Sequence, residues 1–355
     1  MRADDHFFVC RFVVPLRQAI LLGVWVTFGS VANVAPAGDS PRRFEYIETH
    51  MAVPVKVAFY TGDEHAANRA AKEVYAKFNE LNQLFSDYLP ESELNQLCRS
   101  APHPKPVPLS EPLWTVLVRS QQLAEQSDGA FDVTVGPLVR LWRRSRRQRE
   151  LPSNQRLEDA KAVTGWRSMK LDEAVHGVQL LKPEMQLDLG GIAMGYAVDE
   201  GLKILKRHDI ASAMIDASGD IGVTEAPPES KGWRIGIAPL EPHAPPSRYL
   251  LLTNAAVSTA GDAFQFVEIG GQRYSHIVDP KTGLGLNDRT AVTVVAPDCL
   301  TADGLDTAVN VLGTDLGMKL IEDQPGTAAI FFQEKDGKLE IIESTLWKTL
   351  QFDKP

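Results

Sequence analysis

The sequence predicts an α+β fold of two interleaved lobes, with mixed sheets and flanking helices. The 355 residues are 44% hydrophobic and 23% charged, which is typical of a globular protein and argues against disorder. Short strand-like segments are interspersed with longer helical ones. The 26 glycines and 23 prolines supply many short turns between them.

The N-terminus has the organisation of a secretory signal. Arginines precede an apolar run at residues 19–28, and small residues follow at 31–37. The run is shorter than the roughly 20 residues that a membrane-spanning helix needs, which favours a cleaved signal over a retained anchor. We therefore expect a signal peptide at 1–37 and one domain at 38–355 of an exported protein.

The N-terminal half of this domain contains one strand pattern and two helical patterns. A strand is expected at 53–60, followed by an amphipathic helix over 63–85 whose apolar residues recur at spacings of three and four. A second helix is expected to begin at Ser110, whose hydroxyl suits an N-cap. It should end at 128–129, where glycine tolerates a left-handed turn.

The C-terminal half alternates between strand and helix patterns. Strands are expected at 185–189, 213–216, 233–237, 290–295, 328–332 and 339–342. Helices are expected to begin near Ile192, directly after two glycines, and near Ala302. Asp336 and Gly337 form a hairpin-turn dipeptide between the last two strands.

The first candidate site is the glycine turn within 187–199, where a strand leads into Gly190 and Gly191 before a helix opens. Backbone N–H groups at a helix start favour a bound phosphate when no side chain is in the way. The same residues also suit a tight strand-to-helix turn. The segment is neither a GxGxxG motif nor a Walker A loop, so both interpretations stay open.

The second candidate site is a pair of oxygen ligands in the segment 302–309. If this segment is helical, Asp303 and Thr307 are four residues apart and share one face. A carboxylate and a hydroxyl there suit a hard cation such as Mg²⁺. The alternative is capping, with Asp303 near the positive end of the helix.

The third candidate site contains His276 and Asp279, at the end of a strand that enters an Asp-Pro turn. A histidine near an aspartate can act as a general base or hold one in place. A structural histidine and an ordinary turn aspartate are the alternatives.

Three further segments, 128–138, 217–222 and 258–262, each pair small residues with an aspartate at a turn. Each is weak evidence alone, because turns are commonly made of such residues.

The charge distribution restricts the possible partners. A net charge of −9 opposes a general nucleic-acid binder, because neutralising phosphates requires clustered lysine and arginine. One such cluster extends from Arg140 to Arg149. It is expected to be a solvated loop, with a docking patch for an acidic acceptor or a membrane surface as the alternative.

In their order along the chain, the six candidate segments resemble the signature blocks of the ApbE family of FAD:protein FMN transferases, as do 49–51 and 85–95. The six are 128–138, 187–199, 217–222, 258–262, the segment with His276 and Asp279, and 302–309. The resemblance extends from about residue 45 to about residue 345. It implies that FAD binds between the two lobes of an α+β fold and that its pyrophosphate is cut. FMN then moves to a Thr or Ser hydroxyl of an exported acceptor protein, with release of AMP. The resemblance also implies Mg²⁺, with Mn²⁺ as the alternative metal, and a location in the periplasm or at the periplasmic face of the inner membrane.

The resemblance assigns roles to individual residues. On the flavin side it places Met51, Tyr88, Ala130, Phe131, Asp132, Asp188 and Met194. The metal ligands it implies are Asp303, Thr307 and the backbone carbonyl of Gly191. The catalytic pair it implies is His276, the candidate base, together with Asp279.

The chain departs from the family pattern at Met194, where the family usually has a lysine, and this removes a cation near FAD. Ser218 and Ala260 are smaller departures in two other blocks. Two alternative functions therefore stay open. One is an FAD pyrophosphatase with water as the acceptor, and the other is a non-catalytic flavin-binding protein.

Overall fold

The computed structural model describes residues 40–237, 240, 245–246, 248–261 and 265–353. The expected signal peptide at 1–37 and Asp262 of the segment 258–262 lie outside the described residues. Asp39–Pro355 forms one compact unit, which the expected lobes share.

An eight-stranded sheet forms the centre of this unit, in the order β1-β2-β6-β7-β10-β13-β14-β15. Its strands are β1 (Arg42–His50), β2 (Val53–Thr61), β6 (Ala213–Ala217), β7 (Asp220–Val223), β10 (Ala255–Gly261), β13 (Thr290–Ala296), β14 (Ala328–Lys335) and β15 (Lys338–Glu343). All of the neighbouring strands in it pair antiparallel, so the expectation of mixed sheets is wrong. The physical reason lies in the connections. Two-residue turns with positive φ, at Met51 and Ala52 and at Asp336 and Gly337, close hairpins that make consecutive strands antiparallel.

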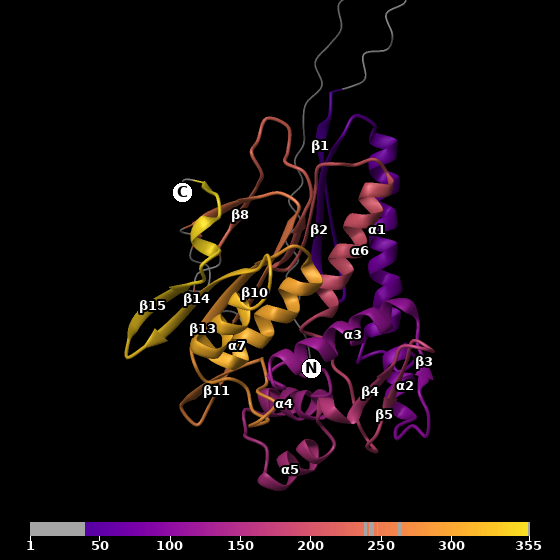
Figure 1. Cartoon of the computed structure of the whole chain (residues 1–355), viewed down its shortest axis with the longest axis vertical. Helices are drawn as coiled ribbons and strands as arrows, with labels where there is room; N and C mark the ends of the chain where they lie inside the picture. The colour runs from indigo at the N-terminus through magenta and orange to yellow at the C-terminus, as the bar shows by residue number, and fades with distance from the viewer. Residues whose placement is uncertain (1–39, 238–239, 241–244, 247, 262–264, 354–355) are drawn as a thin grey trace, which may run out of the picture. The chain divides into compact units, whose positions relative to one another are not determined.

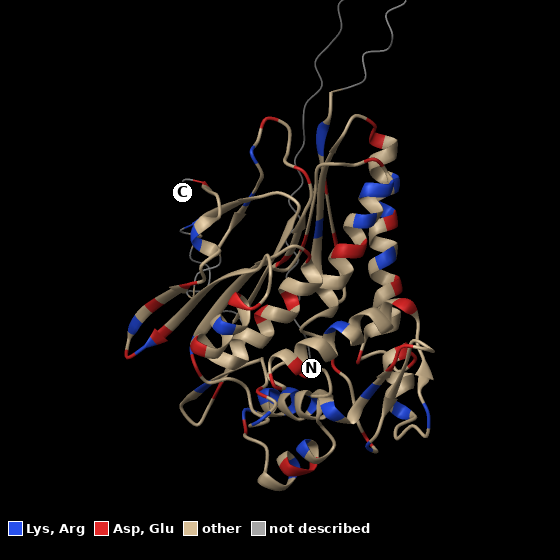
Figure 2. Ribbon diagram, viewed as in Figure 1, with Lys and Arg blue, Asp and Glu red and all other residues tan. Residues whose placement is uncertain are grey.

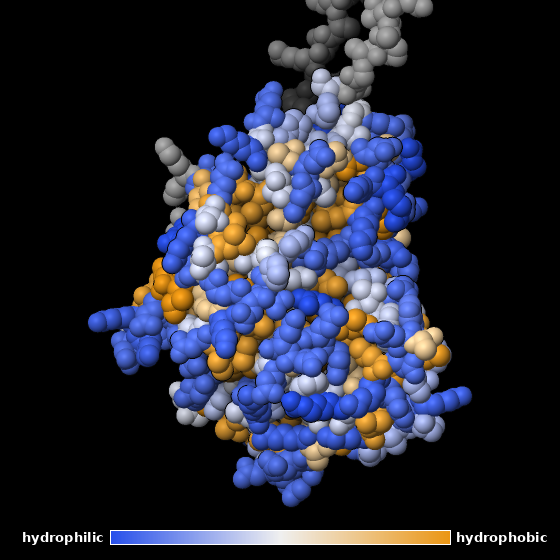
Figure 3. All heavy atoms as spheres, in the orientation of Figure 1, coloured by the Kyte–Doolittle hydropathy of each residue, from blue (hydrophilic) through white to orange (hydrophobic). Residues whose placement is uncertain are grey.

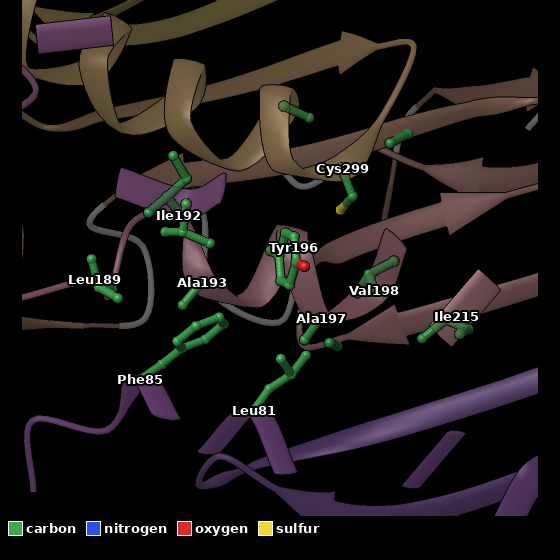
Figure 4. Close-up of a cluster of buried hydrophobic side chains, with 14 of the residues drawn as sticks. Leu81, Phe85, Leu189, Ile192, Ala193, Tyr196, Ala197, Val198, Ile215 and Cys299 are labelled. Carbon is green, nitrogen blue, oxygen red and sulfur yellow. The ribbon is translucent and has the colours of Figure 1, made fainter. Parts of the chain in front are cut away.

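Helices cover one face of this sheet. They are α1 (Glu64–Phe85), α6 (Ala193–Arg207) and α7 (Cys299–Glu322), and α3 (Glu111–Gln126) packs against α1 and α7. Figure 1 shows α1 and α6 side by side, with α7 against the later strands. Figure 4 shows Phe85 of α1 near Tyr196 of α6, and their ring centroids are 5.8 Å apart. Hydrophilic residues cover the outer surface of α1 (Figure 3), so this helix is amphipathic, as its spacing predicts.

A smaller sheet covers the opposite face, with β8 (Trp233–Gly236), β9 (Tyr249–Leu252) and β16 (Phe352–Asp353), together with the short helix η2 (Trp347–Thr349). Alternate residues of the central strands point to the two sides: Val57 belongs to the core under the helices, and Ala58 to the core under the smaller sheet. Trp347 is fully buried in this second core.

The remaining elements lie in the lower part of Figure 1. They are α2 (Glu93–Arg99), α4 (Gly136–Gln148), α5 (Asn154–Ala162), η1 (Trp166–Ser168), β3 (Val107–Pro108), β4 (Met169–Asp172), β5 (Gly177–Leu180), β11 (Phe266–Ile269) and β12 (Gln272–Ser275). Trp142 of α4 is buried in a third, smaller core, and its Nε1 donates to the carbonyl of Ser275 at 2.9 Å.

Most of the expected elements are confirmed. Helix α1 follows its N-cap Asp63, and α3 follows its N-cap Ser110. Helix α6 follows Ile192, as expected. Helix α7 begins three residues before Ala302, because the side chain of Asp298 caps it by accepting a hydrogen bond from the Thr301 N–H.

The prediction of a strand at 185–189 is wrong. The backbone N–H groups of this segment donate to partners outside any sheet: that of Leu187 donates to Cys98 Sγ, and that of Asp188 donates to the carbonyl of Val133 at 2.8 Å. Only Gln186 forms an isolated bridge, to Val135. The segment is therefore an extended loop held between α2 and α4.

The loop expected for Arg140 to Arg149 is also wrong. These arginines lie on α4 or at its C-terminal end. They appear as blue stretches of the α4 ribbon in Figure 2. Apolar and basic residues lie on opposite faces of this helix. The apolar face, with Leu138 and Trp142, is buried, whereas most of the arginines point outward.

Within the residues that the structure describes, no helix combines the length and apolar character needed to cross a bilayer.

Candidate functional site

A cluster of three aspartates lies where β7, β10 and α7 meet. Asp220 begins β7, Ser258 lies in β10, and Asp303 and Asp306 lie in the N-terminal turns of α7. Ser258 Oγ donates to Asp306 Oδ2 at 2.5 Å, and it also hydrogen-bonds Asp220 Oδ1. A hydroxyl has only one hydrogen, so it cannot donate to two ionised carboxylates at once. The carboxylates of this cluster therefore need a further proton or a bound cation between them.

The electrostatics of the cluster favour the same conclusion. Burial raises the pKa of Asp303 and of Asp306 well above the usual range, and the nearby Asp220 raises both further. Partial burial raises the pKa of Asp220 to about 6. Among the described ion pairs, none joins a lysine or arginine to any of these three carboxylates. A cation bound here would supply the missing positive charge.

The expected metal ligands lie beside this cluster. A Cβ added to Gly191 would lie 2.8 Å from Thr307 Oγ1, so the glycine allows the loop before α6 to approach α7 closely. Asp303 Oδ2 accepts a hydrogen bond from the Gly195 N–H at 2.8 Å. The structure thus brings Gly191, Asp303 and Thr307 together at the crossing of α6 and α7.

Tyr88 and Asp188, which are expected to contact the flavin, are joined by Arg143 of α4. One nitrogen of its guanidinium binds Asp87, and Nη2 lies 2.9 Å from Asp188 Oδ2. The same guanidinium carbon lies 4.6 Å from the centroid of the Tyr88 ring. Burial raises the pKa of Asp188, and Arg143 partly offsets this effect.

Ala130, Phe131 and Asp132 are buried in the turn after α3. The Asp132 carboxylate binds inside the protein: Oδ1 accepts from the N–H and hydroxyl of Thr134, and Oδ2 accepts from the Trp166 N–H at 3.0 Å. This side chain therefore holds the turn in place through hydrogen bonds inside the protein.

Met51 and Met194, the two methionines expected on the flavin side, lie in different elements. Met51 lies in the β1–β2 turn, and the pairing of Val55 with Ala217 places that turn beside the β6–β7 turn that precedes Asp220. Met194 lies in the first turn of α6, and both methionines are half-buried against the main core.

His276 and Asp279 lie in the loop after β12, and both are half-buried. His276 Nδ1 lies 3.3 Å from the carbonyl of Gln265. Asp279 Oδ1 accepts from the Lys281 N–H at 2.8 Å, which is the geometry of a turn-forming aspartate. None of the described hydrogen bonds of these two residues reaches the aspartate cluster.

Sequence reasoning missed four residues that organise the site. Asp220, Asp306 and Ser258 belong to segments that were singled out, but their proximity depends on how β7, β10 and α7 are arranged. For Arg143, the run of arginines predicts a solvated loop. No sequence signal pairs it with Asp87 or Asp188, because the partners are distant in the chain.

Two cavities lie near these residues. One of about 750 Å³ is lined by Asp87, Tyr88, Arg140 and Gln186, among others. Another of about 490 Å³ lies beside the N-terminus of α7, where Asp199 accepts hydrogen bonds from the N–H groups of Cys299 and Leu300 at 2.9 Å each.

Comparison with known proteins shows extensive similarity. The sequence model of the ApbE family matches residues 51–331. A "FAD:protein FMN transferase" of Chlamydia muridarum is 31% identical over 278 residues, which are 77% of this chain and 85% of that protein. A protein of the same description from Vibrio cholerae is 32% identical over 279 residues, covering 77% of this chain and 82% of the relative.

Solved structures give the same result for the fold. The flavin transferase ApbE from Vibrio cholerae superposes with a TM-score of 0.79 at 27% identity, over 88% of this chain and 100% of that one. The apo form of Pseudomonas stutzeri flavinyl transferase ApbE gives a TM-score of 0.78 at 29% identity, over 88% and 97% of the two chains. The α+β fold and the family resemblance are confirmed.

Proposed function

The chain belongs to the ApbE family, and on this premise we propose that it transfers FMN from FAD to a Thr or Ser hydroxyl of an acceptor protein. The acceptor oxygen attacks the FMN phosphorus, the bond from that phosphorus to the bridging oxygen breaks, and AMP leaves. The hydroxyl proton passes to a base of the enzyme. The observation that carries the proposal is the aspartate cluster beside Gly191 and Thr307, in a chain that matches the family over most of its length.

The donor set suits a hard cation. Asp303, Thr307 and the carbonyl of Gly191 offer the oxygen ligands that Mg²⁺ or Mn²⁺ prefers, and the unbalanced carboxylates nearby favour positive charge. Among the described residues, no three His, Cys, Asp or Glu side chains surround one metal position, and the proposed set requires only one carboxylate. When bound, such a metal neutralises charge on the pyrophosphate.

The chain's own residues supply the rest of the mechanism. Where α6 opens, the N–H groups of Ile192 and Ala193 donate to the carbonyl of Leu189 and that of Gly195 donates to Asp303. The N–H of Gly191 is therefore the proposed donor to a phosphate oxygen. Tyr88 offers an exposed aromatic face to the flavin, and Met51 offers an apolar contact from the β1–β2 turn. His276 is the proposed base that takes the hydroxyl proton, with Asp279 fixing the turn that carries it.

Export is part of the proposal. The charged, apolar and small-residue order of 1–37 supports removal of a signal peptide and action on an exported acceptor, in the periplasm or at the periplasmic face of the inner membrane.

The experiment that tests the proposal follows the products of FAD by chromatography, in the presence of Mg²⁺ and an acceptor domain. Transfer predicts that AMP appears in equal amount with flavin bound to protein. Asp303→Asn keeps an acceptor for the Gly195 N–H but loses the charge, and it should abolish AMP release. Asp315→Asn, which is exposed and lies beyond the break of α7 at Gly313, is the control.

Free FMN and AMP with an unmodified acceptor would support the pyrophosphatase instead. FAD that binds and stays intact would support a non-catalytic flavin-binding protein.

A further inference from the structure

The most exposed aromatic ring beside the proposed flavin site is held in an unusual way. Tyr88 is 73% exposed, although it lies between two well-packed helices, α1 and α2. The guanidinium of Arg143 covers one side of its ring, with 4.6 Å between the guanidinium carbon and the ring centroid. An exposed tyrosine without such support would sample several rotamers. Here one face is occupied by a cation and the other is free.

Arg143 is itself fixed by two carboxylates from different parts of the chain. Asp87 precedes Tyr88 in the loop after α1, and Asp188 belongs to the loop before α6. The planar fork of an arginine can hold two carboxylates and a ring at once, which a lysine cannot do. Three segments that are remote in sequence therefore meet at this side chain.

The connection continues into the glycine turn. Asp188 Oδ2 binds Arg143, while Asp188 Oδ1 accepts a hydrogen bond from the Gly190 N–H at 2.9 Å. The Asp188 side chain is only 10% exposed, so this arrangement has little freedom to rearrange. The Tyr88 ring and the proposed phosphate-binding turn are thus linked through one carboxylate.

The charges decide what Arg143 does. Two carboxylates bind one guanidinium, so the group carries no spare positive charge for a pyrophosphate. Arg143 is therefore not a phosphate ligand in this geometry. Instead, its guanidinium provides a rigid, flat support for the Tyr88 ring.

We propose that Arg143 is a positioning residue of the flavin site: it fixes the Tyr88 ring so that the uncovered face receives the flat ring system of the flavin. Stacking on an aromatic face that is already fixed avoids the entropy cost of ordering it. Asp87 and Tyr88 also line the cavity of about 750 Å³, so there is free volume next to these two residues. The inference rests on the proposed function and adds to it a residue that the family resemblance does not include.

The test is a double-mutant cycle on binding, measured by quenching of flavin fluorescence in EDTA so that no turnover occurs. Arg143→Met and Tyr88→Leu should each weaken the binding of FAD about tenfold. The double variant should be no weaker than the worse single variant, because both changes remove one unit. Arg147→Met, exposed on the same helix, should bind like the wild type.

The choice of ligand separates positioning from a general structural role. FMN binding should fall by the same factor as FAD binding, while AMP binding should not change. Arg143→Lys keeps a charge for Asp188 and should preserve the folded state, yet it should recover little of the lost flavin affinity, because it lacks the flat face.

The inference is overturned if Arg143→Met and Arg143→Lys bind FAD like the wild type while Tyr88→Leu does not, or if the losses in the cycle add. It is also overturned if AMP affinity falls together with FMN affinity. If the folded wild-type protein binds no flavin at all, both this inference and the proposed function are wrong.

Discussion

Replacing Asp220 with asparagine is expected to stabilise the metal-free protein at neutral pH. In the wild type, Ser258 Oγ lies within hydrogen-bond distance of both Asp220 and Asp306, but its single hydrogen can satisfy only one of them while both are ionised. An asparagine at position 220 would donate an N–H to Ser258 Oγ, and the hydroxyl would then donate to Asp306 alone. The substitution therefore removes one negative charge and completes the hydrogen bonding of its neighbours.

The magnitude follows from the pKa of Asp220, which partial burial raises from 3.8 to about 6. Each pH unit corresponds to about 1.4 kcal/mol, so the ionised carboxylate lowers the free energy of unfolding by about 3 kcal/mol. Because Asp220 is only half-buried, solvent screening reduces the expected gain to about 2 kcal/mol.

The pH dependence has a definite sign. Because the folded pKa lies above the unfolded one, the contribution of Asp220 to stability is complete below about pH 4 and is lost as the pH rises through 6. Urea unfolding in EDTA, between about pH 4 and pH 7, should show a difference between variant and wild type that grows from near zero to about 2 kcal/mol. Asp315→Asn is the control. An Asp220→Asn protein that is less stable at pH 7, or a difference that does not vary with pH, would refute the reasoning.

Three further predictions address the same region. The pKa of Asp199 is raised to about 6 by burial, so its contribution to stability is also lost as the pH rises from about 4 through 6, and Asp199→Asn should flatten that part of the unfolding profile. Gly195→Ala would place a Cβ 2.3 Å from the carbonyl oxygen of Cys299, so it should separate α6 from α7. The free energy of unfolding should fall by about 3 kcal/mol in the same urea assay. An unchanged unfolding midpoint would contradict the close crossing of the two helices. Saturating Mg²⁺ should raise the melting temperature by an amount equivalent to about 2–3 kcal/mol in calorimetry, and Thr307→Val should remove most of this shift; an equal shift in both proteins would exclude Thr307 as a ligand.

Local signals in the sequence were sufficient for most of the fold. The helix at 63–85 and the one after Ser110 have regular apolar spacing and good N-caps, and both signals come from neighbouring residues. The segment 185–189 has the composition of a strand, but its backbone binds Cys98 and a loop. The identity of a hydrogen-bond partner that is distant in the chain cannot be read from composition.

The site was predictable to the extent that its residues are close in sequence. Asp303 and Thr307 share a helical face, which spacing alone predicts, and the structure places Gly191 against Thr307. The proximity of Asp220 and Ser258 to α7 depends on the order of strands in the sheet. Arg143 gave the opposite signal, since a run of arginines usually indicates a solvated surface, whereas this one binds two carboxylates.

The central claim is tested most directly by the intact mass of an acceptor domain after incubation with this protein, FAD and Mg²⁺. The account predicts a mass gain of one FMN on a Thr or Ser of the acceptor, absent with EDTA and absent with Asp303→Asn. An acceptor of unchanged mass, in a reaction where a known family member modifies it, would contradict the account.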